Sequence, residues 1–142
     1  MVGAFERMHT VTDFCDGPIA GVADFNGVPH LYAAEWDAAR RGSTSVFQLT
    51  PISQETFRLL MEDWEIWRRW ETADFAGNAP QGRHPALPRD RARHDELVRQ
   101  IAERINNARL PVVRAHGTVK FDPTMPSLGV RLSALVVRWD PC

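Results

Sequence analysis

Hydrophobic and polar residues alternate near both ends of the chain and recur at helical spacing in its middle. Gly21–Phe25 and Val28–Trp36 flank Asn26-Gly27, a dipeptide that favours the type I′ turn of a β-hairpin. A weaker strand is expected at His9–Cys15 and a short one at Val46–Leu49. The first third of the chain therefore predicts four strands.

Two helices are expected to follow. Thr50 or Ser53 can cap the first, and a loop from Gly77 to Pro88, rich in proline and glycine, ends it. The second helix is expected from about Pro88 to Arg109. The first helix is expected to bury an apolar stripe made of Phe57, Leu60, Met61, Trp64, Trp67 and Phe75, with a second stripe beside it made of Leu59, Ile66 and Trp70. The apolar stripe of the second helix consists of Leu97, Val98, Ile101, Ala102 and Ile105.

The last third predicts two more strands. Residues 113–121 alternate between apolar and polar side chains, and residues 130–139 are apolar on much of both faces. The resulting order, β-β-β-β-α-α-β-β, predicts an α+β fold in which an antiparallel sheet of about five to six strands packs against a two-helix pair. The length of 142 residues fits a single domain, residues 1–142, with residues 1–8 as a loose N-terminal arm.

Composition excludes some classes of protein. A hydrophobic content of 44% and a charged content of 25% are typical of globular domains. No apolar run approaches the roughly 20 residues of a membrane-spanning helix, and the first residues do not resemble a signal peptide. We expect a cytoplasmic protein in which Cys15 and Cys142 are free thiols.

Charge is unevenly distributed along the chain. Residues 1–80 carry a net charge of −6 and residues 81–142 a net charge of +5, so the chain as a whole carries −1. Such asymmetry can mark a binding face. The simpler interpretation is that the acidic and basic halves neutralise each other within one fold.

Asp63 stands out because it lies among apolar residues of the first predicted helix. A buried carboxylate must be paired, hydrogen-bonded or protonated. One interpretation makes Asp63 a catalytic acid that works with a histidine, for which His94 is the candidate. The structural alternative is an ion pair with an arginine of the second helix, or a hydrogen bond from a tryptophan.

His84, Asp90 and His94 form a weaker candidate, for a metal site. Asp90 and His94 are four residues apart and project from one face of a helix, and His84 could approach from the loop. A core histidine bonded to Asp90 or to a backbone carbonyl explains the same spacing. We therefore predict no metal and no other cofactor, because glycine-rich phosphate loops and paired-cysteine motifs are also missing from the sequence.

A ligand pocket could form from polar and aromatic residues on two strands and the first helix. Pockets are mostly apolar with a few convergent polar groups, a description that fits this set, although an ordinary mixed sheet face would present the same residue types. The candidates are His30, Tyr32, Trp36, Trp64, Trp67, Arg114 and His116.

These observations favour a non-catalytic binding or protein-interaction domain. Trp and Arg anchor protein interfaces, and the chain has five tryptophans and no catalytic motif. The expected partner is another protein or a second copy of the chain. The alternatives are a small enzyme that uses Asp63 and His94 or the metal site, and nucleic-acid binding through the arginines of residues 83–109. Nucleic acid is the least favoured partner, because no basic run is interleaved with aromatic residues.

Overall fold

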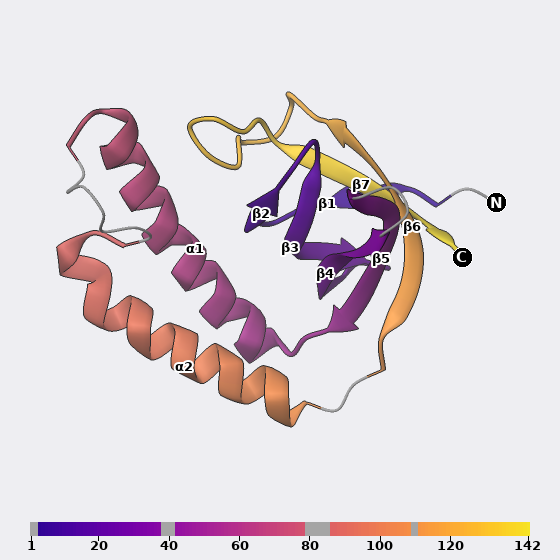
Figure 1. Ribbon diagram of the computed structural model, residues 1–142, viewed down its shortest axis with the longest axis horizontal. Helices are drawn as coiled ribbons and strands as arrows, with labels where there is room; N and C mark the ends of the chain where they lie inside the picture. The colour runs from indigo at the N-terminus through magenta and orange to yellow at the C-terminus, as the bar shows by residue number, and fades with distance from the viewer. Residues whose placement is uncertain (1–2, 38–41, 79–85, 109–110) are drawn as a thin grey trace. The chain divides into compact units, whose positions relative to one another are not determined.

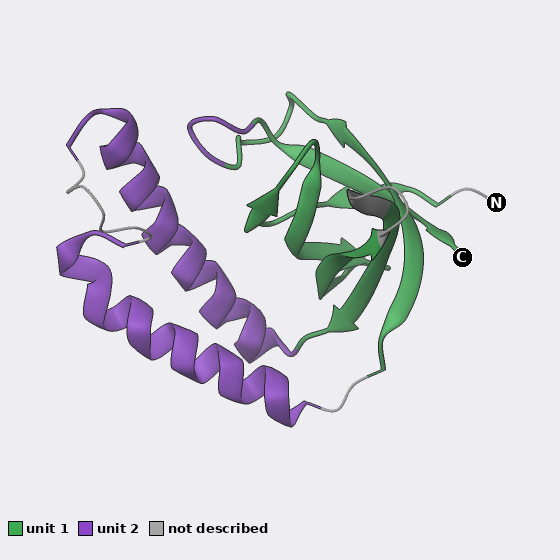
Figure 2. Ribbon diagram, in the orientation of Figure 1, with its two compact units in different colours: residues 1–52, 110–128, 133–142 green, residues 53–109, 129–132 purple. Residues whose placement is uncertain are grey.

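The computed structural model describes residues 3–37, 42–78, 86–108 and 111–142 (Figure 1). The chain divides into two compact units, coloured separately in Figure 2. The sheet unit comprises residues 1–52, 110–128 and 133–142, and the helical unit comprises residues 53–109 and 129–132. Over the described residues, neither helix combines the length and hydrophobicity needed to cross a membrane.

The predicted α+β class and the order of strands, two helices and further strands are confirmed. The sheet has seven strands, not five to six, and every neighbouring pair is antiparallel, in the order β1-β7-β6-β5-β4-β3-β2. The strands are β1 (Phe5–Arg7), β2 (Asp13–Phe14), β3 (Pro18–Phe25), β4 (Val28–Asp37), β5 (Gly42–Pro51), β6 (Val113–Phe121) and β7 (Leu135–Pro141).

The additional strand comes from the segment expected to be a loose arm. Phe5–Arg7 forms β1 and pairs with β7. The chain then turns to β3, where the backbone N–H of His9 donates to the carbonyl of Val22 at 2.8 Å. Met8, between these contacts, is only 2% exposed. One short segment thus hydrogen-bonds to strands near both ends of the curled sheet, and no local sequence pattern indicates such pairing.

The Asn26-Gly27 hairpin is present as expected. Both residues have positive φ, 52° and 75°, as a type I′ turn requires. The Glu6 carboxylate accepts hydrogen bonds from both turn N–H groups, at 3.1 and 2.7 Å. The β1 segment therefore also holds the tip of the β3–β4 hairpin.

Aromatic side chains fill the inner face of the curled sheet. Phe47 packs edge-on against Tyr32 and Trp139, with ring centroids 5.9 and 5.5 Å apart. The Trp139 indole N–H donates to the Asp24 carbonyl at 2.9 Å, and the Tyr32 hydroxyl donates to the Thr10 carbonyl at 2.8 Å. Because the indole N–H of Trp139 and the hydroxyl of Tyr32 each have a partner, neither ring is buried with an unsatisfied donor.

The helical unit consists of α1 (Gln54–Phe75) and α2 (Arg91–Asn107), with a short 3₁₀ turn, η1 (Pro88–Asp90), before α2. Of the two proposed caps, Ser53 is the one used, and its hydroxyl accepts from the Thr56 N–H at 3.1 Å. The core between the helices is small. It consists of Leu59, Ile66, Ala86, Leu97 and Ile101, with Leu60 at its edge.

The strand expected at His9–Cys15 is limited to Asp13–Phe14, and the one expected at Val46–Leu49 extends over Gly42–Pro51. Two further boundaries differ from expectation for identifiable reasons. The residues from Pro88 to Asp90 are a 3₁₀ turn and not the first turn of α2. The strand expected from residue 130 begins only at Leu135, because the backbone N–H of Val130 donates to the buried carboxylate of Glu71 on α1 at 2.9 Å. Residues 129–132 thus belong to the helical unit.

Close packing around Gly117 gives a test of this interior. A Cβ at this position would lie 2.8 Å from the Trp139 ring and 2.9 Å from the Phe47 ring. We expect Gly117→Ala to lower the free energy of unfolding by about 1–3 kcal/mol, the usual cost of overpacking a core. Thr118→Ala, at an exposed neighbouring position, should change it by less than about 0.5 kcal/mol. Urea unfolding measures both, and equal effects would contradict this packing.

Candidate functional site

Asp63 and His94 form the shortest contact between α1 and α2 that involves a predicted site residue. The His94 Nδ1 lies 2.6 Å from Asp63 Oδ1, and the two side chains are 15% and 25% exposed. A carboxylate at Nδ1 fixes the orientation of the imidazole and directs its other nitrogen, Nε2, away. The structure therefore brings the two proposed catalytic residues together, in an arrangement that also serves as a structural pair.

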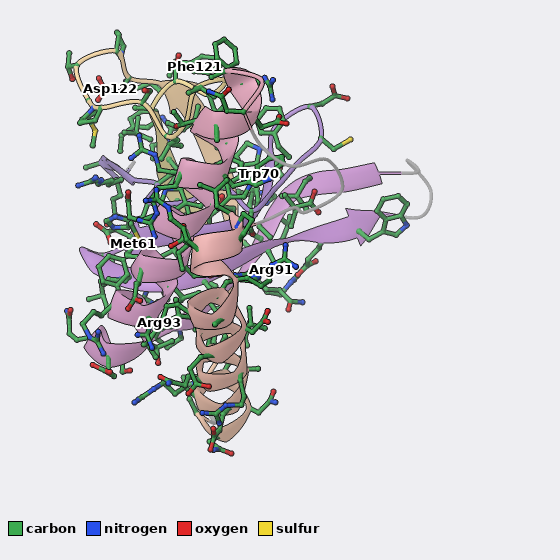
Figure 3. The ribbon with its side chains drawn as sticks, turned by 90° about the vertical axis from the view of Figure 1, so that its left-hand side faces the viewer. Met61, Trp70, Arg91, Arg93, Phe121 and Asp122 are labelled. Carbon is green, nitrogen blue, oxygen red and sulfur yellow. The ribbon has the colours of Figure 1, made fainter. Side chains whose placement is uncertain are left out.

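Two more ion pairs flank this contact along the helix pair. Arg93, labelled in Figure 3, donates to Glu62, with the Nη2 to Oε1 distance at 2.8 Å. Arg69 binds both oxygens of Asp90 at 3.0 Å. These guanidinium groups lower the pKa of Glu62 and of Asp90 through their hydrogen bonds. The line of contacts joins the helices beside their small apolar core.

The proposed metal ligands have other partners. Asp90 is occupied by Arg69 and His94 by Asp63. His84 lies outside the described residues. Within the part of the chain that the structure describes, no group of three or more potential ligands is close enough to hold a metal ion.

Most arginines of the second helix are paired with carboxylates. Arg93 contacts Glu62, Arg99 contacts Glu96 and Glu103, and Arg104 lies 3.8 Å from Glu55. Nucleic-acid binding needs arginines that can exchange counterions for phosphate. Pairing within the helical unit reduces the charge available for that exchange.

A second candidate site lies on the sheet unit. β4 and β5 pair with each other as far as Asp37 and Gly42, whereas the pairing of β4 with β3 ends at Ala33 and that of β5 with β6 ends at Val46. Residues 35–37 and 42–45 therefore extend past their neighbours as a two-stranded ribbon, here called the hairpin arm. Trp36 on this arm is 70% exposed, the highest value among the large hydrophobic residues described as exposed.

Beside Trp36 is an open hollow of about 650 Å³. Its lining consists of Ala33, Ala34, Glu35, Trp36, Gln48 and Arg114. Arg114 donates to both oxygens of Glu35, at 2.6 and 2.8 Å, and this contact, together with the Gln48 amide, lowers the pKa of the Glu35 carboxyl. The ion pair crosses from β6 to β4 over Gln48, which lies opposite both Ala33 and Arg114. One charged pair and one exposed indole thus define the site.

The remaining pocket candidates lie elsewhere. Tyr32 and His30 are buried, with His30 Nδ1 2.7 Å from the Val28 carbonyl, and burial raises the pKa of the Tyr32 hydroxyl. His116 is exposed and lies 3.3 Å from the Ser45 hydroxyl. Trp64 and Trp67 stack on each other within the helical unit, with ring centroids 4.7 Å apart. Of the seven candidates, the hollow unites Trp36 and Arg114.

Sequence reasoning did not select Glu35 and Gln48. Strict alternation assigns Trp36 to the same face as Tyr32, but the register shifts between Ala34 and Trp36, as in a β-bulge. Arg114 meets Glu35 only because β6 pairs with β5, although the two helices separate these strands in the sequence. Neither feature has a local signal, although a glutamate next to a tryptophan at the end of a predicted strand could have marked the position.

Comparisons with protein-family models, curated proteins and solved structures find no match to the chain. The proposals below therefore depend on the geometry alone.

The lowered carboxyl pKa values predict how the helical unit responds to acid. The carboxylates of Asp90 and Glu62 bind protons less readily in the folded chain than in the unfolded chain. Their contribution to the stability of the fold is therefore complete above about pH 4–5, and it is lost as the pH falls below the ordinary carboxyl pKa. We expect Asp90→Asn to cost about 1 kcal/mol or less at pH 7 and to make stability depend less on pH in the acid range.

Urea unfolding of the full chain at pH 7 and near pH 3 measures this difference. Asp95→Asn, an exposed position on the same helix, is the matched control and should leave the pH dependence unchanged. If Asp90→Asn and the parent lost the same stability on acidification, the Arg69–Asp90 contact would not contribute.

Proposed function

We propose that this protein is a non-catalytic binding domain that contacts a protein partner through the hairpin arm. The observation that carries the proposal is the 70% exposure of Trp36. An exposed indole leaves a large apolar surface in water, and covering that surface with a partner is favourable. Tryptophan is also the residue type most enriched among the side chains that dominate interface energies.

The surroundings of Trp36 suit a protein surface better than a small molecule. The hollow is open, whereas small-molecule sites enclose most of their ligand. Arg114 lies in the same hollow, and its bidentate contact with Glu35 holds the guanidinium in place before any partner binds. Preorganisation of this kind reduces the entropy lost on binding. Exposed, free Cys15 and Cys142 support the further proposal of a reducing compartment such as the cytoplasm.

Trp36→Ala separates a binding role from a structural one. Because the side chain is largely exposed, we expect the free energy of unfolding to change by less than about 0.5 kcal/mol. Crosslinking of the tagged chain in lysate, followed by mass spectrometry, should identify proteins that the parent captures and Trp36→Ala does not.

Phe121→Ala is the matched control, because Phe121 is 64% exposed at the opposite end of β6 from Arg114. It should retain the same partners. Equal capture by the parent and Trp36→Ala would show that the arm is not the contact surface.

A second candidate function is acid–base catalysis by Asp63 and His94. The 2.6 Å contact between them favours it, because a histidine oriented by a carboxylate is a common general base. The neighbouring ion pairs explain the same geometry as part of a structural line of contacts, so this candidate ranks below the first.

Chromogenic esters and phosphate esters provide a direct test of the catalytic candidate. If the pair is catalytic, the parent hydrolyses one of these substrates and His94→Gln loses about 10²-fold or more of that rate, which is typical for removal of a general base. Glu62→Gln, which breaks the adjacent ion pair, should keep the rate. Equal rates in the parent and His94→Gln would exclude the pair as the catalyst.

A further inference from the structure

The hairpin arm carries an exposed tryptophan at the border of an open hollow. Trp36 is largely exposed on the arm, and it borders the hollow together with Ala33 and Ala34, the two smallest of the lining residues. A bulky exposed side chain and an open hollow therefore occur on one surface. In an isologous dimer the same surface is used twice, so a residue that projects from one copy must meet a recess on the other.

The charges of the hollow lead to the same conclusion. Glu35 is 23% exposed and Arg114 57% exposed, so both remain accessible at the surface while paired. Two copies that face each other across a two-fold axis can place each Arg114 near the partner's Glu35. A uniformly acidic or uniformly basic partner would instead meet one like charge, which weakens binding.

We propose that the partner of the hairpin arm is a second copy of this chain, with Trp36 of each copy seated in the hollow of the other. This inference rests on the proposed binding function and names its partner. Each buried indole would cover on the order of 200 Å², so the two tryptophans supply only part of the roughly 1,200 Å² of a stable interface. Interfaces at the low end of this size range are typically weak and transient, so we expect a dissociation constant on the order of micromolar.

Sedimentation equilibrium of the full chain between about 1 and 100 µM tests the proposal. We expect a reversible monomer–dimer equilibrium, and Trp36→Ala should raise the dissociation constant by at least about 30-fold, as loss of an interface hot spot does. Phe121→Ala should leave the constant unchanged. A parent chain that remains monomeric throughout this range, or a dimer that Trp36→Ala does not weaken, would overturn the proposal.

Charge complementation tests the arrangement itself. Glu35→Arg and Arg114→Glu should each be monomeric, because each homodimer would bring like charges together. Mixed in equal amounts, they should form a heterodimer, since both contacts between the copies are then between opposite charges. Circular dichroism verifies that each variant is folded. Monomers alone in the mixture of two folded variants would contradict the two-fold arrangement.

The two proposals fail in different ways. A monomeric parent that still captures another protein in a Trp36-dependent manner would refute self-association and leave the binding function intact. A monomeric parent that captures nothing would refute both.

Discussion

The pairing of β5 with β6 is the constraint on which the sheet and its candidate site depend. Only four residues of each strand are in register, Val46–Leu49 opposite Val113–His116, yet they close the sheet across the whole helical insertion. Side chains alternate between faces with period two, so a shift by one residue would turn Arg114 inward and Ala115 outward. The register therefore fixes the interior around Phe47 and the contact of Arg114 with Glu35 at once.

The two helices of the helical unit are held together by ion pairs as well as by apolar packing. Their apolar core is small, and of the apolar stripe expected on α2 only Leu97 and Ile101 are buried. Exposed ion pairs contribute little individually. Their value here lies in number and direction. Asp63 and Glu62 on α1 contact α2, and Arg69 on α1 contacts Asp90 in the turn before α2, so together they define how the two antiparallel helices align. Asp63 thus has a structural reason for its position among apolar residues, whether or not it also acts on a substrate.

Local chemistry explains which parts of the fold could be predicted. Asn26-Gly27 requires positive φ, and Ser53 offers a hydroxyl to a free N–H, so the hairpin and the start of α1 follow from neighbouring residues. β1 could not be predicted, because Phe5–Arg7 is stabilised by residues more than a hundred positions away. The late start of β7 has the same origin, since Glu71 competes for the preceding segment. At the candidate site, Trp36 and Arg114 could be chosen by residue type, but their proximity depends on long-range register.

Trp36 and Trp139 show why residue type alone does not separate core from site. Both lie on strands, and both are flanked by charged residues. Trp139 is 7% exposed and its indole N–H is bonded to the Asp24 carbonyl across the interior, so its surface and its polar group are both satisfied within the chain. Trp36 lies on the hairpin arm, beyond the last residues that pair with β3 and β6, and its surface remains in water. Trp139 is covered and hydrogen-bonded within the chain, whereas most of the Trp36 surface lies in water, and the long-range pairing of their strands decides between the two outcomes.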